Sequence, residues 1–412
     1  MRLFLGILLT TSEILRRITQ GTTMARIDSI GHLQVYNSHV EPTTEFAVHL
    51  ADGSKGRAAS PHGETVGVYE RHGTLFDAPA VVAAMREDGI LGRDLDQESF
   101  DAYLAGKVDS FGKDTCYALS LALFQALQAA SPGAGEGALP GRRPRLCCNI
   151  LNGGWHAYTN PVLSDFSEYL LVARTDDVAT VLEAHAEIQR AVREGLSETA
   201  KAVVGGNTVN RFPTADNREC IEFLLGIRDR LGLASEFDLM IDAAAAGLAT
   251  DAGYAFSITD GSVRSSDELL EYWLTIVDEY QLRHLEDPFG EGDTDAWHGL
   301  TTSGGGCLVI GDDLYCSDAG RIEEGAARSW THGVIVKPNQ AGSVTATRRA
   351  IDAAARTGQV AIASHRSVST ETPFEAVLTC TFGAPYIKIG PLMTDYSSVM
   401  RLNEIIRLTS EG

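Results

Sequence analysis

In the second half of the chain, a series of short apolar runs each leads into a charged residue. If these runs are parallel strands of one barrel, their carboxyl ends meet at one mouth, where the side chains that follow them converge. The spacing is roughly one strand–helix unit, which favours that arrangement. The pattern therefore predicts one site, built from Asp242, Glu286, Asp312, Lys337, His365, Arg366 and Lys388.

These residue types suit one kind of chemistry when they stand together. Three carboxylates are the ligands that a hard dication such as Mg²⁺ prefers. Two lysines suit an anionic substrate, and one of them can act as a base if its neighbours lower its pKa. Each residue alone has a simpler explanation, because an Asp or Glu after a strand is often a helix cap and a lone Lys or His is usually solvated or structural. What favours a site is that all of these residues stand at the same place relative to their strands, at the carboxyl end of an apolar run.

The elements that must position these residues change character along the chain. Residues 25–146 mix strand-like runs, a turn signal at Asp52-Gly53 and helical stretches, which predicts an N-terminal α+β capping domain. The segment 131–144 is rich in Gly and Pro and predicts a loop near a domain boundary. In residues 147–412 apolar strands alternate with amphipathic helices, which predicts a C-terminal α/β barrel of parallel strands covered by helices. Residues 1–24 form an extension outside both domains.

Composition excludes several classes of partner. The formal charge of −21 argues against binding to nucleic acid or to an anionic membrane. Seven scattered cysteines form no CxxC pair, so the sequence predicts neither a disulfide framework nor a zinc site, and it indicates a cytoplasmic protein. The apolar stretch near the N-terminus is short and is soon followed by Arg16 and Arg17, which favours an upstream start codon or an amphipathic extension over a signal peptide.

Several longer motifs resemble the enolase family, and the resemblance runs nearly the whole length from Ala25. In the N-terminal part, residues 37–45 and 56–60 look like the enolase small domain. The barrel motifs are Asn149-Ile-Leu-Asn-Gly-Gly-Trp-His156, Leu285-Glu-Asp-Pro-Phe289, Gly311-Asp-Asp-Leu314, Val336-Lys-Pro-Asn-Gln-Ala-Gly-Ser343, Ser364-His-Arg-Ser367 and Ile387-Lys-Ile-Gly390.

The resemblance implies a substrate and a role for each matching residue. The substrate would be a small phosphorylated three-carbon acid, 2-phosphoglycerate or phosphoenolpyruvate, and the cofactor two Mg²⁺ ions, the second arriving with the substrate. Lys337 matches the base that removes the proton next to the carboxylate. The remaining matches are Asp242, Glu286 and Asp312 to the Mg²⁺ ligands, Lys388 and His365 to contacts with the substrate carboxylate, Arg366 and Ser367 to phosphate contacts, and His156 to a further active-site histidine.

The sequence departs from the enolase pattern at three places. The flexible small-domain loop that helps to hold the second metal is matched by residues 62–67, where Thr65 replaces the metal-binding serine. Nine residues beyond His156, where enolases carry a glutamate, stands Asp165. The second essential glutamate is matched by Thr208, which cannot act as a general acid near neutral pH. Enolate formation and phosphate recognition are thus predicted to be intact, and the groups that manage the leaving water to be changed.

These departures leave three interpretations open. The first is a changed reaction, because the sequence resembles the carboxyphosphonoenolpyruvate synthases of phosphinothricin-type biosynthesis, which implies joining a phosphonoformate unit to an enolpyruvate unit. In it Asp165, Thr208, Thr65, His62 and Arg211 shape the second substrate's pocket. The second is an ordinary phosphopyruvate hydratase whose site has drifted, or an alignment shifted near Thr208. The third is a catalytically silent relative that serves as a binding protein, which the retained lysines and carboxylates argue against.

The resemblance also implies self-association. Enolases are typically dimers or octamers, so a homodimer or higher homo-oligomer is expected. His39 stands where the family has an arginine at its dimer contact, so this contact must differ in detail.

Overall fold

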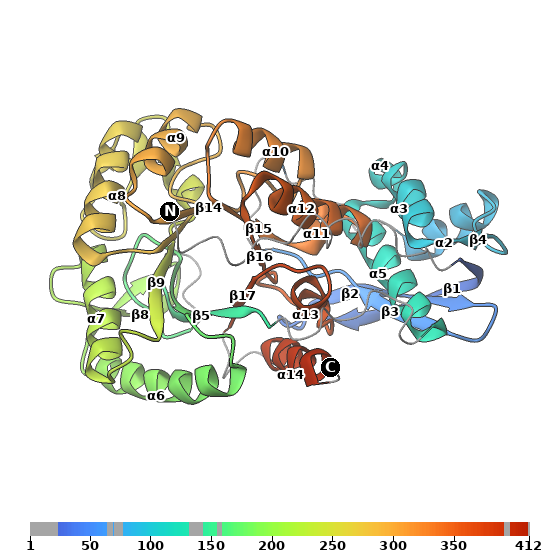
Figure 1. Ribbon diagram of the computed structural model, residues 1–412, viewed down its shortest axis with the longest axis horizontal. Coiled ribbons are helices and arrows are strands. Elements are labelled where there is room, and N and C mark those ends of the chain that lie inside the picture. Colours follow the sequence, from blue (N-terminus) through green and yellow to red (C-terminus); the bar gives the residue numbers. More distant parts are fainter. Residues whose placement is uncertain are drawn as a thin grey trace.

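The computed structural model describes residues 24–63, 69, 77–131, 143–154, 159–390 and 396–410. Thr65 and His156, both assigned roles from the sequence, lie outside the described residues, as do residues 64–67 of the loop that begins at His62. Figure 1 shows two parts side by side, an N-terminal part at one end and a barrel at the other. Within the described residues no helix is long and apolar enough to cross a membrane.

The N-terminal part is a sheet covered by helices, as expected for a capping domain. The strand order is β3-β2-β1-β4, with antiparallel pairing throughout. Gly56 in β3 lies against the long helix α5, where a Cβ would come within 2.2 Å of the Ala122 carbonyl oxygen. Gly53 takes φ +91° in the turn that the sequence signalled. The elements are β1 (Ala25–Tyr36), β2 (Pro42–Leu50), β3 (Lys55–Ala59), α2 (Ala78–Glu87), β4 (Asp94–Leu95), α3 (Gln97–Ala105), α4 (Val108–Phe111) and α5 (Lys113–Ala130).

The second part is a closed eight-stranded barrel, which confirms the predicted fold class. Going round it, the order is β13-β14-β15-β16-β17-β5-β6-β9. Inward-facing apolar side chains, such as Met240, Ile310 and Ile335, fill its interior. The strands are β5 (Arg145–Asn152), β6 (Glu168–Ala173), β9 (Phe237–Asp242), β13 (His284–Glu286), β14 (Leu308–Gly311), β15 (Gly333–Val336), β16 (Val360–Ala363) and β17 (Tyr386–Ile389).

One strand corrects the expectation of an all-parallel barrel. β6 runs antiparallel to both of its neighbours, β5 and β9. The described residues between β5 and β6 form no helix, and a parallel return would need a crossover of a dozen or more residues, usually helical. Strand reversal therefore brings the beginning of β6, rather than its end, to the same mouth as the ends of the parallel strands.

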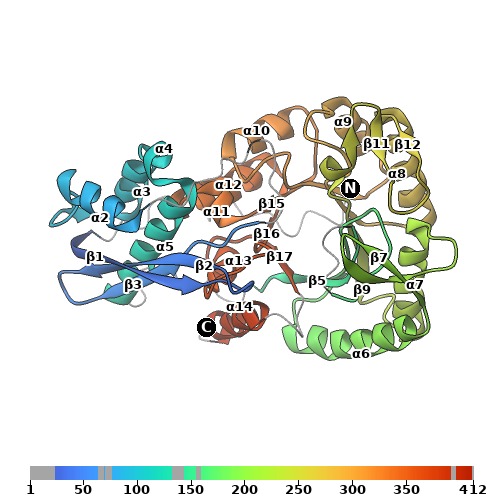
Figure 2. The ribbon, with the colours of Figure 1, turned by 180° about the vertical axis from the view of Figure 1, so that it is seen from behind.

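Helices cover the outside of the barrel, as Figures 1 and 2 show. The sequence predicted most of them but missed the hairpin of β7 (Ala200–Val204) and β8 (Asn207–Arg211), whose turn is made by Gly205 and Gly206 at positive φ. A small three-stranded sheet follows β9 and was also missed. The helices are α6 (Val178–Ser197), α7 (Asn217–Arg230), α8 (Ser266–Tyr280), α9 (Thr294–Ser303), α10 (Ala319–Ala327), α11 (Pro338–Ala341), α12 (Val344–Thr357), α13 (Phe374–Cys380) and α14 (Tyr396–Ser410); the 3₁₀ turn η1 (Ala245–Leu248) precedes β10 (Ala249–Thr250), β11 (Gly253–Ala255) and β12 (Val263–Arg264).

Hydrogen bonds join the two parts close to the barrel mouth. The Ser38 N–H donates to the Ser369 carbonyl at 2.9 Å, and the Ser369 N–H donates to Ser38 Oγ at 2.9 Å. Asn339, directly after the predicted base Lys337 and Pro338, donates to the Pro61 carbonyl at 3.0 Å. The capping domain is therefore a fixed wall beside the mouth.

Candidate active site

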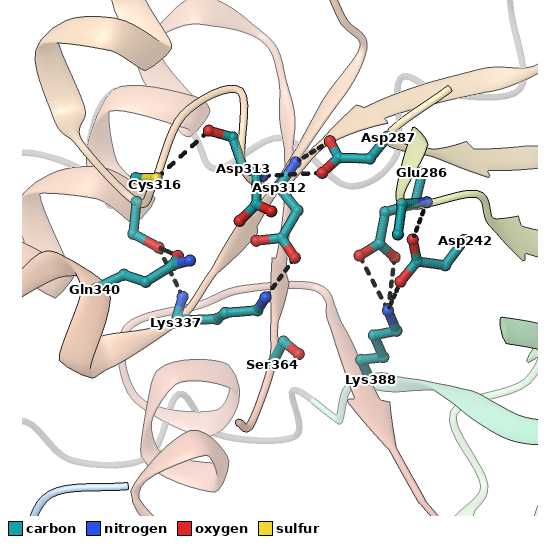
Figure 3. Close-up of polar contacts among 12 residues, drawn as sticks. Asp242, Glu286, Asp287, Asp312, Asp313, Cys316, Lys337, Gln340, Ser364 and Lys388 are labelled. Carbon is teal, nitrogen blue, oxygen red and sulfur yellow. Dashed lines mark hydrogen bonds and ion pairs between the residues drawn. The ribbon is translucent and has the colours of Figure 1, made fainter. Parts of the chain in front are cut away.

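The barrel brings the predicted carboxylates and lysines together. Asp242 ends β9 and Glu286 ends β13, and these two residues are direct partners in the parallel pairing of the strands. Asp312 follows β14, Lys337 follows β15, and Lys388 lies within β17. Figure 3 shows both lysine side chains extending towards the carboxylates. The convergence predicted from sequence spacing is present in the fold.

Lys388 is surrounded by three carboxylates. Its Nζ lies 2.7 Å from Asp242 Oδ2 and 2.9 Å from each carboxylate oxygen of Glu286. Glu168 Oε2 is 2.8 Å from the same nitrogen, as an ion pair without hydrogen-bond geometry. Burial alone would lower the pKa of Lys388, but Asp242, Glu168 and Glu286 raise it well above its ordinary value, so this amine stays charged.

The pKa values of Glu286 and Asp242, two carboxylates of this cluster, are shifted in opposite directions. Burial and the neighbouring Asp242 carboxylate raise the pKa of Glu286 well above its ordinary value, although Lys388 opposes the shift. Burial would also raise the pKa of Asp242, but Lys388 lowers it below the ordinary value. The two carboxylates repel each other, with Glu286 fully buried and Asp242 largely so, and added positive charge would relieve that repulsion.

Lys337 is paired with Asp312, and its position is fixed by backbone contacts. Its Nζ donates to Asp312 Oδ2, and its backbone N–H donates to Ser317 Oγ at 2.8 Å. Pro338 begins α11 directly after it, which sets the chain direction at this point. Burial would lower the pKa of Lys337, but Asp312 raises it above its ordinary value. A cation bound to Asp312 would weaken its ion pair with Lys337 and lower the pKa of the amine. More of the amine would then be neutral and able to accept a proton.

A second acidic group surrounds the turn after β14. Asp287 accepts the backbone N–H groups of Asp312 and Asp313 at 2.8 and 3.0 Å, so its two oxygens hold that turn in place. Burial and Asp312 raise the pKa of Asp287 well above its ordinary value, and burial with Asp312 raises that of Asp313 to about 7. Oxygens of Asp287, Asp312 and Asp313 lie within 4.8 Å of one another.

Among the described residues, only the oxygens of Asp287, Asp312 and Asp313 lie close enough together to hold one metal ion with the side chains as they stand, and the predicted set of Asp242, Glu286 and Asp312 shares Asp312 with them. Asp312 Oδ1 is buried and has no hydrogen-bond partner among the described residues, so a ligand position is open there. We favour Asp242, Glu286 and Asp312, because both oxygens of Asp287 are engaged by backbone N–H groups. A set of carboxylate oxygens suits Mg²⁺.

The phosphate-binding candidates stand on the other side of the same cavity. His365, Arg366 and Ser367 follow β16 and, with Lys337 and Lys388, line a cavity of about 100 Å³. Arg366 is 3% exposed, and a Cβ on Gly63 would lie 1.8 Å from its guanidinium nitrogen, so the capping domain touches this arginine. His365 Nδ1 lies 3.4 Å from the Lys388 carbonyl oxygen. The cavity therefore combines an anion-binding side with a carboxylate side.

Comparison with known proteins gives this arrangement a family. Residues 143–411 match the enolase C-terminal TIM barrel domain. Proteins named enolase from Kineococcus radiotolerans, Halobacterium salinarum and Acidothermus cellulolyticus are 30%, 31% and 32% identical to the chain. Each alignment covers 94% of this chain and 95%, 100% and 95% of the respective relative. The chain belongs to the enolase family.

One carboxylate predicted from the enolase pattern is not at the mouth. Asp165, nine residues after His156, is buried and accepts hydrogen bonds from Asn217 Nδ2 at 3.1 Å, from the Ile258 N–H at 2.8 Å and from the Thr259 hydroxyl. These contacts hold loops together, and Asp165 is not among the described residues that line the cavity. Its prediction as a catalytic residue is corrected, because counting from His156 assumed a connection of fixed length.

The glutamate at the mouth is Glu168, which sequence reasoning missed. It is the first residue of β6 and pairs across the antiparallel ladder with Asp242. Asn149 Nδ2 donates to its Oε1 at 2.8 Å, and its other oxygen faces Lys388. A signal was available, since Glu168 opens an apolar strand, but the pattern that predicted the site consists of charges that follow strands, and β6 runs the other way.

Of the remaining departures, the hairpin residues lie away from the cavity, whereas Gly63 of the loop that begins at His62 lines it. Thr208 and Arg211 belong to the β7–β8 hairpin, where both are exposed, and neither is among the described residues that line the cavity. His62 is half-exposed and places Nε2 3.5 Å from Glu41 Oε2, while its neighbour Gly63 reaches Arg366. The structure thus brings together all three predicted metal ligands, both lysines and the three residues after β16, and leaves Asp165, Thr208 and Arg211 outside.

Proposed function

We propose that this protein is a Mg²⁺-dependent enolase-family enzyme that removes the proton next to the carboxylate of 2-phosphoglycerate, or handles the enolpyruvate unit of phosphoenolpyruvate. The observation that carries this proposal is that Lys337 and Arg366 line the same cavity as Asp242 and Asp312, and that Glu286 is the partner of Asp242 on the neighbouring strand. An amine, an anion-binding guanidinium and oxygen ligands for a dication are the groups that this chemistry needs.

Each residue has a separate task in this proposal. Arg366 and Ser367 hold the phosphate, since a guanidinium offers a planar pair of donors to phosphate oxygens. Lys388 and His365 face the substrate carboxylate, and Lys337 takes the proton. Asp242, Glu286 and Asp312 would hold Mg²⁺, which supplies positive charge against the enolate as it forms.

The finer proposal is that the enol oxygen of phosphoenolpyruvate forms a bond to the phosphorus of phosphonoformate, as in carboxyphosphonoenolpyruvate synthases. The bond from that oxygen to its own phosphate breaks, and orthophosphate leaves with the hydroxyl oxygen displaced from phosphonoformate; with 2-phosphoglycerate, water is lost as well. What supports this proposal is that, among the described residues, Thr208 offers no carboxylate where the enolase pattern has its second glutamate for the leaving water. Thr208 stands where the enolase pattern has a glutamate, and it lies on an exposed hairpin. A single glutamate, Glu168, is left on the β6 side of the cavity among the described residues that line it. Enolases use two glutamates for this task.

Glu168 also supports a second candidate, the phosphopyruvate hydratase reaction. This glutamate borders the cavity beside Lys388, where a carboxylate can accept or donate a proton to a leaving hydroxide. Asp165 therefore no longer argues against hydration, and the case for a changed reaction rests on Thr208 and on the residues around His62.

Two measurements separate these candidates. Deuterium uptake at the carbon next to the carboxylate of 2-phosphoglycerate, in D₂O with Mg²⁺, reports proton removal by Lys337 in either case. Absorbance from phosphoenolpyruvate reports hydratase turnover. Exchange without turnover, together with a joined product detected by mass spectrometry when phosphonoformate is added, supports the synthase, whereas rapid turnover supports the hydratase. A protein that showed no exchange, and formed no joined product from phosphoenolpyruvate and phosphonoformate, would contradict both.

A further inference from the structure

The residues that follow the proposed base are held by the capping domain as well as by the barrel. We call residues 337–345 the base segment, because it begins with Lys337 and runs through α11 into the start of α12. Figures 1 and 2 both show α11 and α12 beside α5 of the capping domain. On the barrel side, Ser317 Oγ accepts the Lys337 N–H at 2.8 Å and donates to Gln340 Oε1 at 2.9 Å. The barrel therefore fixes the segment near its beginning.

The first contact of the segment with the capping domain is at Asn339, two residues after Lys337. Asn339 Nδ2 donates to the Pro61 carbonyl at 3.0 Å and lies 3.5 Å from Asp114 Oδ1 in the first turn of α5. Ser60 Oγ lies 3.0 and 3.1 Å from the same two oxygens. Because Asn339 is buried, water cannot easily replace its hydrogen bond to the capping domain. A buried bond between the two domains thus lies two residues from the proposed base.

The second contact is at the start of α12, where the first N–H groups of a helix have no partner within the helix. The Val344 N–H donates to Ser120 Oγ at 2.9 Å. The Thr345 N–H donates to Asp101 Oδ2 at 2.8 Å, and the helix dipole favours a carboxylate at this position. Ser120 and Asp101 are both buried, and Gln97 Nε2 donates to both side chains, at 3.1 and 3.0 Å. Residues of the capping domain therefore fix where this barrel helix begins.

These contacts bear on the chemistry through the backbone of the base segment. A lysine side chain is long and flexible, so the direction of the backbone limits where its amine can reach. Proton removal needs the reacting atoms about 3–3.5 Å apart, and a displacement of about 1 Å can lower a rate about a hundredfold. Other bonds between the domains do not touch this segment, such as the one that Thr370 Oγ1 donates to the Ala59 carbonyl at 3.0 Å. The two kinds of interdomain bond can therefore be tested against each other.

We propose that Asn339, Ser120 and Asp101 are positioning residues for proton removal, which hold the base segment so that the Lys337 amine reaches the carbon next to the substrate carboxylate. This inference rests on the proposed role of Lys337 as the base. None of the three is among the described residues that line the catalytic cavity, so they act through the backbone and not on the substrate. Their loss should slow the chemical step while the contacts that bind the substrate stay in place.

The test measures deuterium exchange into 2-phosphoglycerate, in D₂O with Mg²⁺, over a range of substrate concentrations that separates the rate at saturation from the KM. Asn339→Leu and Asp101→Leu each remove one contact with a side chain of similar size, whereas Asp101→Asn keeps an oxygen that can accept the Thr345 N–H. Thr370→Val is the matched control, because it also removes one buried hydrogen bond to a capping-domain carbonyl. Urea unfolding gives the folded fraction of each variant, so that rates are expressed per folded molecule.

We expect Asn339→Leu and Asp101→Leu to lower the exchange rate at saturation by about ten- to a hundredfold, with the KM changed by less than about twofold. Asp101→Asn should recover most of this loss, and Thr370→Val should exchange at the wild-type rate. If Asp101→Leu does not fold, Ser120→Ala removes the acceptor of the neighbouring N–H instead, with the same expected result.

Three results would overturn the inference and leave Lys337 as the base. They are wild-type rates at saturation in Asn339→Leu and in the variants at the start of α12, an equal loss in Thr370→Val, and a raised KM with an unchanged rate. Wild-type protein without exchange would instead overturn the proposed role of Lys337, and the inference with it.

Discussion

The two sides of the barrel mouth differ in charge and in the way the chain builds them. On one side, β9, β13, β14, β15 and β17 bring Asp242, Glu286, Asp312, Lys337 and Lys388 together in contacts of ion-pair distance. On the other side, β5 and β6 bring asparagines and the single acid Glu168, next to a cavity lined mainly by neutral groups. The charged side is suited to proton removal, and the neutral side is where a change of reaction can be accommodated.

The largest expected effect is on the charged side, at the proposed base. Lys337→Ala should lower the rate of deuterium exchange into 2-phosphoglycerate by about 10³-fold, because general base catalysis typically contributes on that scale. The exposed Lys55→Ala is the control and should leave exchange unchanged. Exchange at near wild-type rate in Lys337→Ala would remove the basis for treating the charged side as the catalytic one.

Removing the other lysine should affect stability as well as rate. Lys388→Met leaves Asp242, Glu286 and Glu168 without their shared cation, and breaking a buried ion pair from one side costs about 3–5 kcal/mol. Urea unfolding measures the loss. Added Mg²⁺ should restore part of it, since a dication can compensate the same carboxylates. If the variant is as stable as wild type, the carboxylates are not held together by Lys388.

Two acidic residues of the neutral side, Glu168 and Asp165, lie close together in the chain but have different contacts. Glu168→Gln should lower turnover about a hundredfold with little change in stability, because its carboxylate borders the cavity. Asp165→Asn should lower the free energy of unfolding by about 1–3 kcal/mol, because its carboxylate binds Asn217 and Thr259, while turnover per folded molecule is retained. The reverse pattern would restore the catalytic role that sequence counting gave to Asp165.

The smallest effects are expected on the β7–β8 hairpin. Thr208→Ala and Arg211→Ala should change the free energy of unfolding by less than about 0.5 kcal/mol, because both side chains are exposed. Exchange and product formation should also stay at wild-type levels. A tenfold loss of activity in either variant would mean that the hairpin reaches the substrate, as the sequence interpretation had it.

The sequence predicted the charged side because each of its strands runs towards the mouth. A side chain directly after such a strand must lie there, so Asp242, Asp312 and Lys337 could be assigned from their place behind apolar runs. The overall class, a capping domain and a barrel, followed from the change from mixed to alternating elements along the chain.

The neutral side could not be predicted in the same way. Glu168 is the first residue of its strand rather than the last, and the direction of β6 depends on how the chain returns after β5, which local hydrophobicity does not report. Asp165 was chosen by a fixed count from His156, but loops vary in length while strand register does not. The hairpin was missed because its strands are only five residues long each, and the segment around Thr208 was interpreted by its match to the enolase pattern rather than as two strands joined by a turn.

Gly63 has a consequence for the tolerance of this protein to substitution. Its Cα stands against the guanidinium of Arg366, in space that any Cβ would have to share. Any side chain at this position therefore requires the Arg366 guanidinium to move, although the glycine offers no functional group of its own. Gly63→Ala would therefore lower phosphate affinity indirectly, because its Cβ displaces the guanidinium of Arg366.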